Sequence, residues 1–103
     1  MKFKILLLLL LSSSVFANEA DECKIVENTA DMLIQLRQGE IDLRKVFDDS
    51  KYRLSEHQAQ LLEAMIADAL SKPVYVTIPE QQKVIDEFVT DWKESCLKSD
   101  NSK

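Results

Sequence analysis

Hydrophobic residues recur every three to four positions along four stretches of the chain, which is the spacing of amphipathic helices. The stretches run from about residue 21 to 38, from about 42 to 50, from Ser55 and from Thr77. Their apolar positions are Cys23, Val26, Ala30, Leu33 and Ile34; Leu43, Val46 and Phe47; Leu62, Met65, Ile66, Ala69 and Leu70; and Val84, Ile85, Phe88, Val89, Trp92 and Cys96. The pattern predicts an all-α fold.

The expected helix ends carry residues that start or stop helices. Ser55 and Thr77 are each followed three residues later by Gln or Glu, which predicts two capping boxes. Gly39 is placed to end the first helix in a left-handed conformation. Pro73 bars continuation of the third helix, and Pro79 falls in the first turn of the fourth, where it costs no hydrogen bond.

Residues 74–78, between the last two helices, alternate with the period of two that is typical of extended backbone. One such segment cannot form a sheet alone. The favoured interpretation is a connector that tucks Val74 and Val76 under the helices. The alternative is an exposed edge that accepts a strand from a partner.

The beginning of the chain has the composition of an export signal. Two lysines precede an unbroken apolar run that is too short to span a bilayer, and Val15 and Ala17 occupy positions −3 and −1 of a signal-peptidase site. We therefore expect a signal peptide over residues 1–17, cleaved before Asn18, and a soluble exported product. The expected helical domain is 18–97, and the polar residues 98–103 predict a disordered tail.

The only two cysteines, Cys23 and Cys96, lie at opposite ends of that helical domain. Two cysteines in an exported chain of this size predict one disulfide. The bond requires the first and last helices to pack side by side and antiparallel. The expected architecture is a small four-helix bundle closed by this disulfide, in the periplasm or the secreted fraction.

Charge narrows the range of partners. Removing the signal peptide, which holds Lys2, Lys4 and no acid, takes the formal net charge from −5 to −7. An acidic chain disfavours nucleic acid and anionic membranes, so we expect a protein partner and no stable membrane insertion after cleavage. Glu87, Asp91 and Glu94 form one stripe on the last helix, for which a solvated face is the default interpretation.

The residue types needed for catalysis are scarce. His57 is the only histidine, and an exposed position in the first turn of the third helix is its expected place. With both cysteines in a disulfide, zinc lacks a ligand set, and one glycine excludes phosphate-binding loops. We therefore expect no enzyme activity, no metal and no cofactor. Arg37 continues the apolar face of the first helix, either paired with an acid or favoured by the helix C-terminus.

Several positions together resemble a known family. Arg37-Gln38-x-Glu40 after the helix of Cys23, then Ala69-Leu70-x-x-Pro73-x-Tyr75, then Glu87-Phe88 and Cys96, resemble small exported proteins of gamma-proteobacteria. Their pattern is Cys…Arg-Gln-x-Gly…Pro-x-Tyr…Glu-Phe…Cys, and in this chain the glycine, Gly39, stands one place early. The resemblance implies a periplasmic location and that Arg37, Gln38, Pro73 and Tyr75 act together. We expect the polar members, Arg37, Gln38 and Tyr75, to form a cluster that is used for binding or for structure. It implies no activity.

Two functions remain open at this stage. The first is a protein-binding module, such as an inhibitor, an immunity-type protein or an envelope accessory factor. The alternative is a periplasmic acid or stress chaperone, since 18 acids face 11 Lys and Arg (13 minus the two in the signal peptide) and acidification turns the chain strongly positive. Neither the partner nor the oligomeric state can be deduced from the sequence.

Overall fold

The computed structural model of the protein describes residues 19–101, so the predicted signal peptide lies outside the described residues. Within this part of the chain the protein is all-α. Its elements are α2 (Glu19–Gln38), α3 (Leu43–Ser50), the 3-10 turn η1 (Lys51–Arg53), α4 (Glu56–Leu70) and α5 (Ile78–Asn101). The four predicted helices are thereby confirmed, and residues 74–78 form no strand.

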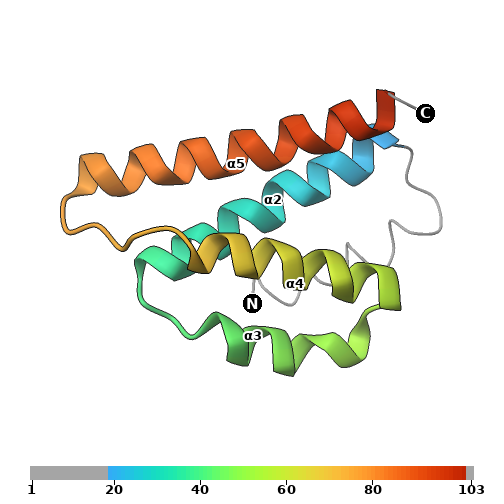
Figure 1. The fold of residues 1–103 in the computed structure, drawn as a ribbon, viewed down its shortest axis with the longest axis horizontal. Coiled ribbons are helices and arrows are strands. Elements are labelled where there is room, and N and C mark those ends of the chain that lie inside the picture. The colour runs from blue at the N-terminus through green and yellow to red at the C-terminus, as the bar shows by residue number, and fades with distance from the viewer. Residues whose placement is uncertain (1–18, 102–103) are drawn as a thin grey trace.

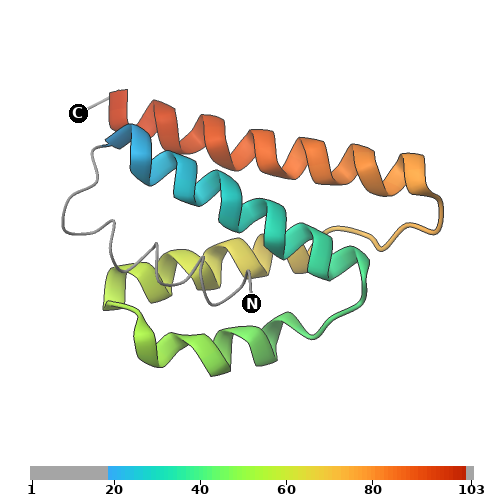
Figure 2. The same ribbon diagram turned by 180° about the vertical axis from the view of Figure 1, so that it is seen from behind.

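The helices lie side by side in the spatial order α5, α2, α4, α3, and α2 and α5 run antiparallel (Figures 1 and 2). The apolar faces predicted from the sequence meet in one core. Its buried members are Val26, Ala30, Leu33, Ile34, Leu43, Leu62, Met65, Ile66, Ala69 and Phe88. A further tie links α4 to α5, because Trp92 Nε1 donates a hydrogen bond of 2.9 Å to Asp68 Oδ2.

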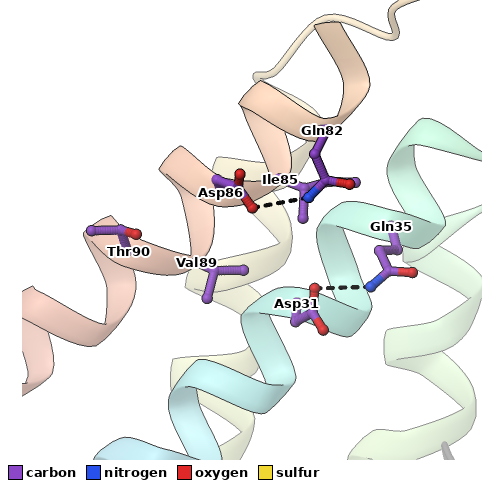
Figure 3. A pocket seen from close by; sticks show the side chains of 7 residues that line it. All are labelled: Asp31, Gln35, Gln82, Ile85, Asp86, Val89 and Thr90. Carbon is purple, nitrogen blue, oxygen red and sulfur yellow. Dashed lines mark hydrogen bonds between the residues drawn. The ribbon is translucent and has the colours of Figure 1, made fainter. Parts of the chain in front are cut away.

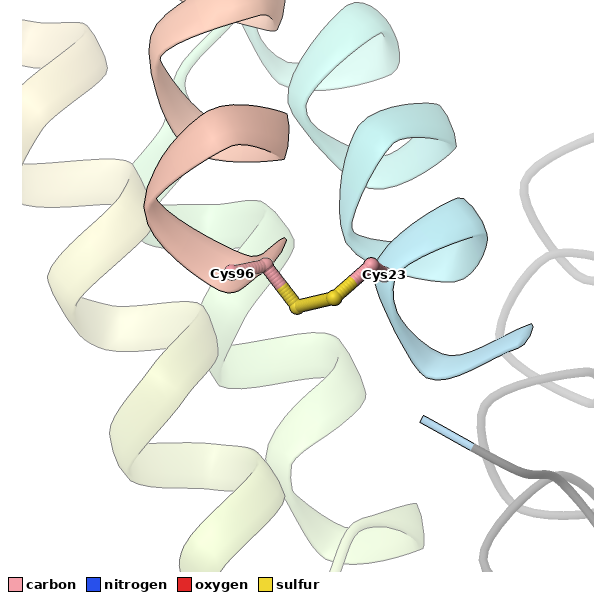
Figure 4. Close-up of a disulfide and its surroundings, with 2 residues drawn as sticks. All are labelled: Cys23 and Cys96. Carbon is pink, nitrogen blue, oxygen red and sulfur yellow. A yellow bond between two sulfur atoms is a disulfide. The ribbon is translucent and has the colours of Figure 1, made fainter. Parts of the chain in front are cut away.

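The predicted disulfide is present and joins α2 to α5 (Figure 4). Cys23 lies in the first turns of α2 and Cys96 in the last turns of α5, with 5.5 Å between their Cα atoms. Because the bond spans 73 positions of sequence, it closes almost the whole described chain into one loop. Chain-entropy arithmetic for a loop of this length gives about 4–4.5 kcal/mol of stabilisation.

The helix starts follow local side-chain chemistry. Ser55 forms the predicted capping box with Gln58, with both reciprocal hydrogen bonds in place. At the start of α5 the Thr77 hydroxyl accepts from Glu80 N at 3.3 Å but donates to the Glu80 carboxylate at 2.7 Å. This second predicted box is therefore half formed, since the carboxylate binds the hydroxyl.

The end of α2 corrects the expected role of Gly39. The helix ends at Gln38 as predicted, yet the left-handed residue is Glu40, at φ 60°, and Gly39 has no positive φ. Glu40 N bonds the Arg37 carbonyl at 3.0 Å and Ile41 N bonds the Leu36 carbonyl at 2.9 Å. These two bonds make a Schellman motif, which places the left-handed residue one position after Gly39.

The last helix extends further than its composition suggests. α5 continues to Asn101, four residues into the segment 98–103 that polar composition assigns to a disordered tail. In the described part of the chain, no helix is both long and apolar enough to cross a membrane.

Candidate functional site

The structure places the Gln38 side chain against the backbone of Tyr75. Gln38, at the end of α2, is buried and reaches the connector between α4 and α5. Its amide Nε2 donates to the Pro73 carbonyl at 2.7 Å, and its Oε1 accepts from the Tyr75 backbone N–H at 2.9 Å. The side chain thus provides one donor and one acceptor to the backbone, as a neighbouring strand would.

Two further side chains hold the same connector. Arg37 Nε donates to the Lys72 carbonyl at 3.1 Å, and Gln81 Nε2 in α5 donates to the Tyr75 carbonyl at 2.7 Å. We name Arg37, Gln38 and Gln81, with the connector backbone at residues 72–75 that they bind, the connector clamp. It replaces the strand partner that a lone extended segment lacks, so its first role is structural.

The structure decides between the two roles that the sequence left open for Arg37, pairing with an acid or a place at the helix C-terminus. The side chain is half-buried and lies in the last turn of α2, where the helix dipole favours a cation. Within residues 19–101 no salt bridge joins it to an acid. Its guanidinium binds a backbone carbonyl instead, and no hydrogen bond between described residues joins it directly to Tyr75.

The connector differs from its favoured interpretation at Val76. Val74 is half-buried, but the Val76 side chain is 93% exposed and Ile78 is 73% exposed. Tucking both valines under the helices was therefore wrong for Val76. The chain bends at Val76 and Thr77, directly after the residue whose two backbone groups Gln38 and Gln81 bind, so the alternation of an extended segment ends there.

The sequence did not reveal a groove that lies between α2 and α5 (Figure 3). It measures about 530 Å³ and is lined by Asp31, Gln35, Gln82, Ile85, Asp86, Val89 and Thr90. Gln35 Nε2 donates to Asp31 Oδ1 at 2.8 Å, and Gln82 Nε2 donates to Asp86 Oδ1 at 2.9 Å. The groove therefore carries two carboxylates beside apolar side chains, and no lysine or arginine is among these lining residues.

The sequence contains the spacing of the polar residues that line this groove, but that spacing alone does not predict the groove. Asp and Gln stand four residues apart in both helices, as neighbours on a helix surface do. That the two pairs face each other follows only from the antiparallel alignment of α2 and α5. A smaller hollow, of about 270 Å³, lies beside the connector and is lined by Tyr75, Glu80, Lys83, Val84 and Glu87.

The remaining residues singled out in the sequence lie on the surface. His57 is exposed in the first turn of α4, and the stripe of Glu87, Asp91 and Glu94 on α5 is exposed as well. No group of three or more metal-ligating side chains gathers anywhere in residues 19–101.

The described part of the chain belongs to the class of small all-α proteins in which a disulfide joins the first and last helices. Comparison with protein-family models, curated proteins and solved structures found no match. The resemblance to exported gamma-proteobacterial proteins therefore stays a prediction.

Proposed function

We propose that this chain is an exported, periplasmic protein-binding module that recognises a basic segment of another protein in the groove between α2 and α5. The observation that carries the proposal is the groove itself, in which Asp31 and Asp86 present carboxylates beside the apolar Ile85 and Val89. An arginine or lysine of a partner supplies the matching charge, and its aliphatic stem suits the apolar surface.

The frame around the groove supports the same function. Its two walls, α2 and α5, are joined covalently by Cys23 and Cys96 at one end. At the other end the connector clamp ties α2 to the chain entering α5. A groove held at both ends loses little conformational freedom when a partner binds, which favours affinity. The acidic net charge favours encounter with a basic partner.

The test begins with a partner captured from periplasmic extract on the oxidised protein, then identified and purified. The groove variant is Asp31→Asn with Asp86→Asn, which removes two charges and keeps an oxygen for each glutamine to bind. The matched control is Asp91→Asn, an exposed acid of α5 outside the groove lining. We expect the groove variant to weaken binding about tenfold or more and to reduce its salt dependence, whereas the control stays within about twofold.

Three results would contradict the proposal. One is equal binding by the groove variant and the control, since the partner then binds elsewhere. Another is binding only to unfolding clients and only after acidification, which identifies a chaperone. The third is turnover of a cell-wall or peptide substrate that His57→Ala abolishes, which identifies an enzyme.

A further inference from the structure

Three contacts align α2 with α5 on either side of the groove. They are the disulfide, an ion pair of 3.8 Å and the shared hold on the connector, and they match Cys23 with Cys96, Glu27 with Lys93, and Gln38 with Gln81. Because the two helices run antiparallel (Figure 1), each residue forward in α2 stands opposite a residue one place earlier in α5. In this alignment Asp31 lies at the level of Val89, and Asp86 lies at the level of Ile34.

The groove is the stretch of this seam in which the carboxylates lack a basic neighbour. Glu27, one turn before Asp31 on α2, has Lys93 across the seam. Val89 stands in the corresponding place across from Asp31, and within residues 19–101 no salt bridge joins Asp31 or Asp86 to a base. A glutamine amide holds Oδ1 of each aspartate, and Oδ2 has no hydrogen bond to another described residue. A basic partner therefore supplies a cation to each wall of the groove.

We propose that the partner's basic segment lies extended along the groove and presents two consecutive basic residues, one to Asp31 and the next to Asp86. The two aspartates come from opposite walls (Figure 3), and their levels differ by about three residues of helix, or about 4.5 Å. In an extended chain, successive side chains point to opposite sides and are about 3.3 Å apart, so neighbours in sequence reach both walls. Side chains two residues apart point to the same wall, and those three apart are separated by about 10 Å.

The rest of the groove suits the same segment. Ile85 and Val89 line it together with the two aspartates, and the aliphatic stems of basic side chains pack on such apolar surface. The disulfide and the connector clamp hold the walls at their present alignment, so the two carboxylates keep a fixed offset. This inference rests on the proposed function, since it specifies the partner of the same groove. It adds that the order of the cations, and not only their number, determines affinity.

The experiment compares two peptides of equal composition on the oxidised protein. In acetyl-Ala-Arg-Arg-Ala-Ala-amide the arginines are adjacent, whereas in acetyl-Ala-Arg-Ala-Arg-Ala-amide one alanine separates them. An NMR titration at low salt follows the side-chain amide signals of Gln35 and Gln82, which bind the two aspartates. We expect the peptide with adjacent arginines to bind about fivefold more tightly, with a dissociation constant on the order of 1 mM.

Single variants assign the two contacts. In Asp31→Asn and in Asp86→Asn the advantage of adjacent arginines should disappear, because only one wall keeps its charge. In Asp91→Asn, which changes an exposed acid outside the groove lining, the advantage should remain.

The outcomes separate this inference from the proposed function. Equal binding of the two peptides, or tighter binding of the one with separated arginines, would overturn the extended pair of basic residues. The groove would then still be the basic site if Asp31→Asn with Asp86→Asn weakened both peptides. No shift of either glutamine signal at about 10 mM peptide would overturn the inference as well. Binding of both peptides that depends on neither aspartate would overturn the inference and the proposed function together.

Discussion

Replacing Gln38 tests whether the connector clamp holds the fold. The side chain is 8% exposed and makes two hydrogen bonds, of 2.7 Å to the Pro73 carbonyl and 2.9 Å from the Tyr75 N–H. A hydrogen bond contributes about 0.5–1.5 kcal/mol net, and a partly buried group left unpaired costs more. Gln38→Ala removes both bonds at once, so we expect the free energy of unfolding to fall by about 2–3 kcal/mol.

The assay is urea unfolding of the oxidised protein, followed by helical circular dichroism, with hydrogen exchange of the Tyr75 amide as a second readout. Gln35→Ala is the matched control, because Gln35 is an exposed glutamine of the same helix. We expect it to change stability by less than about 0.5 kcal/mol. In Gln38→Ala the Tyr75 amide should exchange fast, because its acceptor is gone.

Gln38→Glu separates the two hydrogen bonds. The carboxylate still accepts from Tyr75 N–H, but its second oxygen faces the Pro73 carbonyl, where only a donor fits. The folded variant therefore favours the protonated carboxyl, and its pKa lies above the unfolded value. The stabilisation is present below the unfolded pKa, about 4.3, and is lost as pH rises through the folded pKa. The stability gap to wild type should narrow on acidification.

The account of the clamp would be refuted if Gln38→Ala lost no more stability than Gln35→Ala and the Tyr75 amide stayed protected from exchange. A gap between Gln38→Glu and wild type that does not depend on pH would show that Pro73 needs no donor.

The other predictions concern the disulfide and the end of α2. Reducing Cys23–Cys96 should remove up to about 4–4.5 kcal/mol and unfold most of the protein; thiol titration should find free sulfhydryls only after reductant, and an unchanged melting temperature would contradict this. Glu40→Gly should stabilise by about 0.5–1 kcal/mol, because φ 60° strains a residue with a side chain. Gly39→Ala should stabilise by about 0.4–1 kcal/mol, since its new Cβ meets only two carbonyl oxygens, at 3.5 and 3.6 Å. Urea unfolding measures both effects. If Glu40→Gly and Gly39→Ala both lowered the stability, the assignment of the left-handed residue after α2 would be wrong.

The position of the left-handed residue shows how local signals can mislead. A glycine directly after a helix is the usual left-handed cap, and Gly39 has this position in the sequence. The Schellman bonds from Glu40 and Ile41 instead put the left-handed residue one place later. In the resembled pattern the glycine stands at position 40, where this chain has Glu40.

The apolar faces and the starts of the helices could be predicted because they depend on short-range rules. Helical spacing of apolar residues, the Ser55 capping box and two cysteines at the ends of the domain led to the four helices and the antiparallel closure. Each of these signals acts within a few residues or through one covalent bond, so no knowledge of the remaining contacts was needed.

The surfaces depended on contacts between segments distant in the chain. Gln38 meets Tyr75 across 37 positions, and the chain bends at Val76, so that this side chain faces solvent against the alternation in the sequence. Asp31 and Asp86 line one groove only because α2 and α5 lie antiparallel. Sequence by itself determined which faces are apolar and where helices begin. Tertiary structure alone decided which polar and apolar side chains remain available to a partner, because that depends on which backbone and side-chain groups the fold has already used.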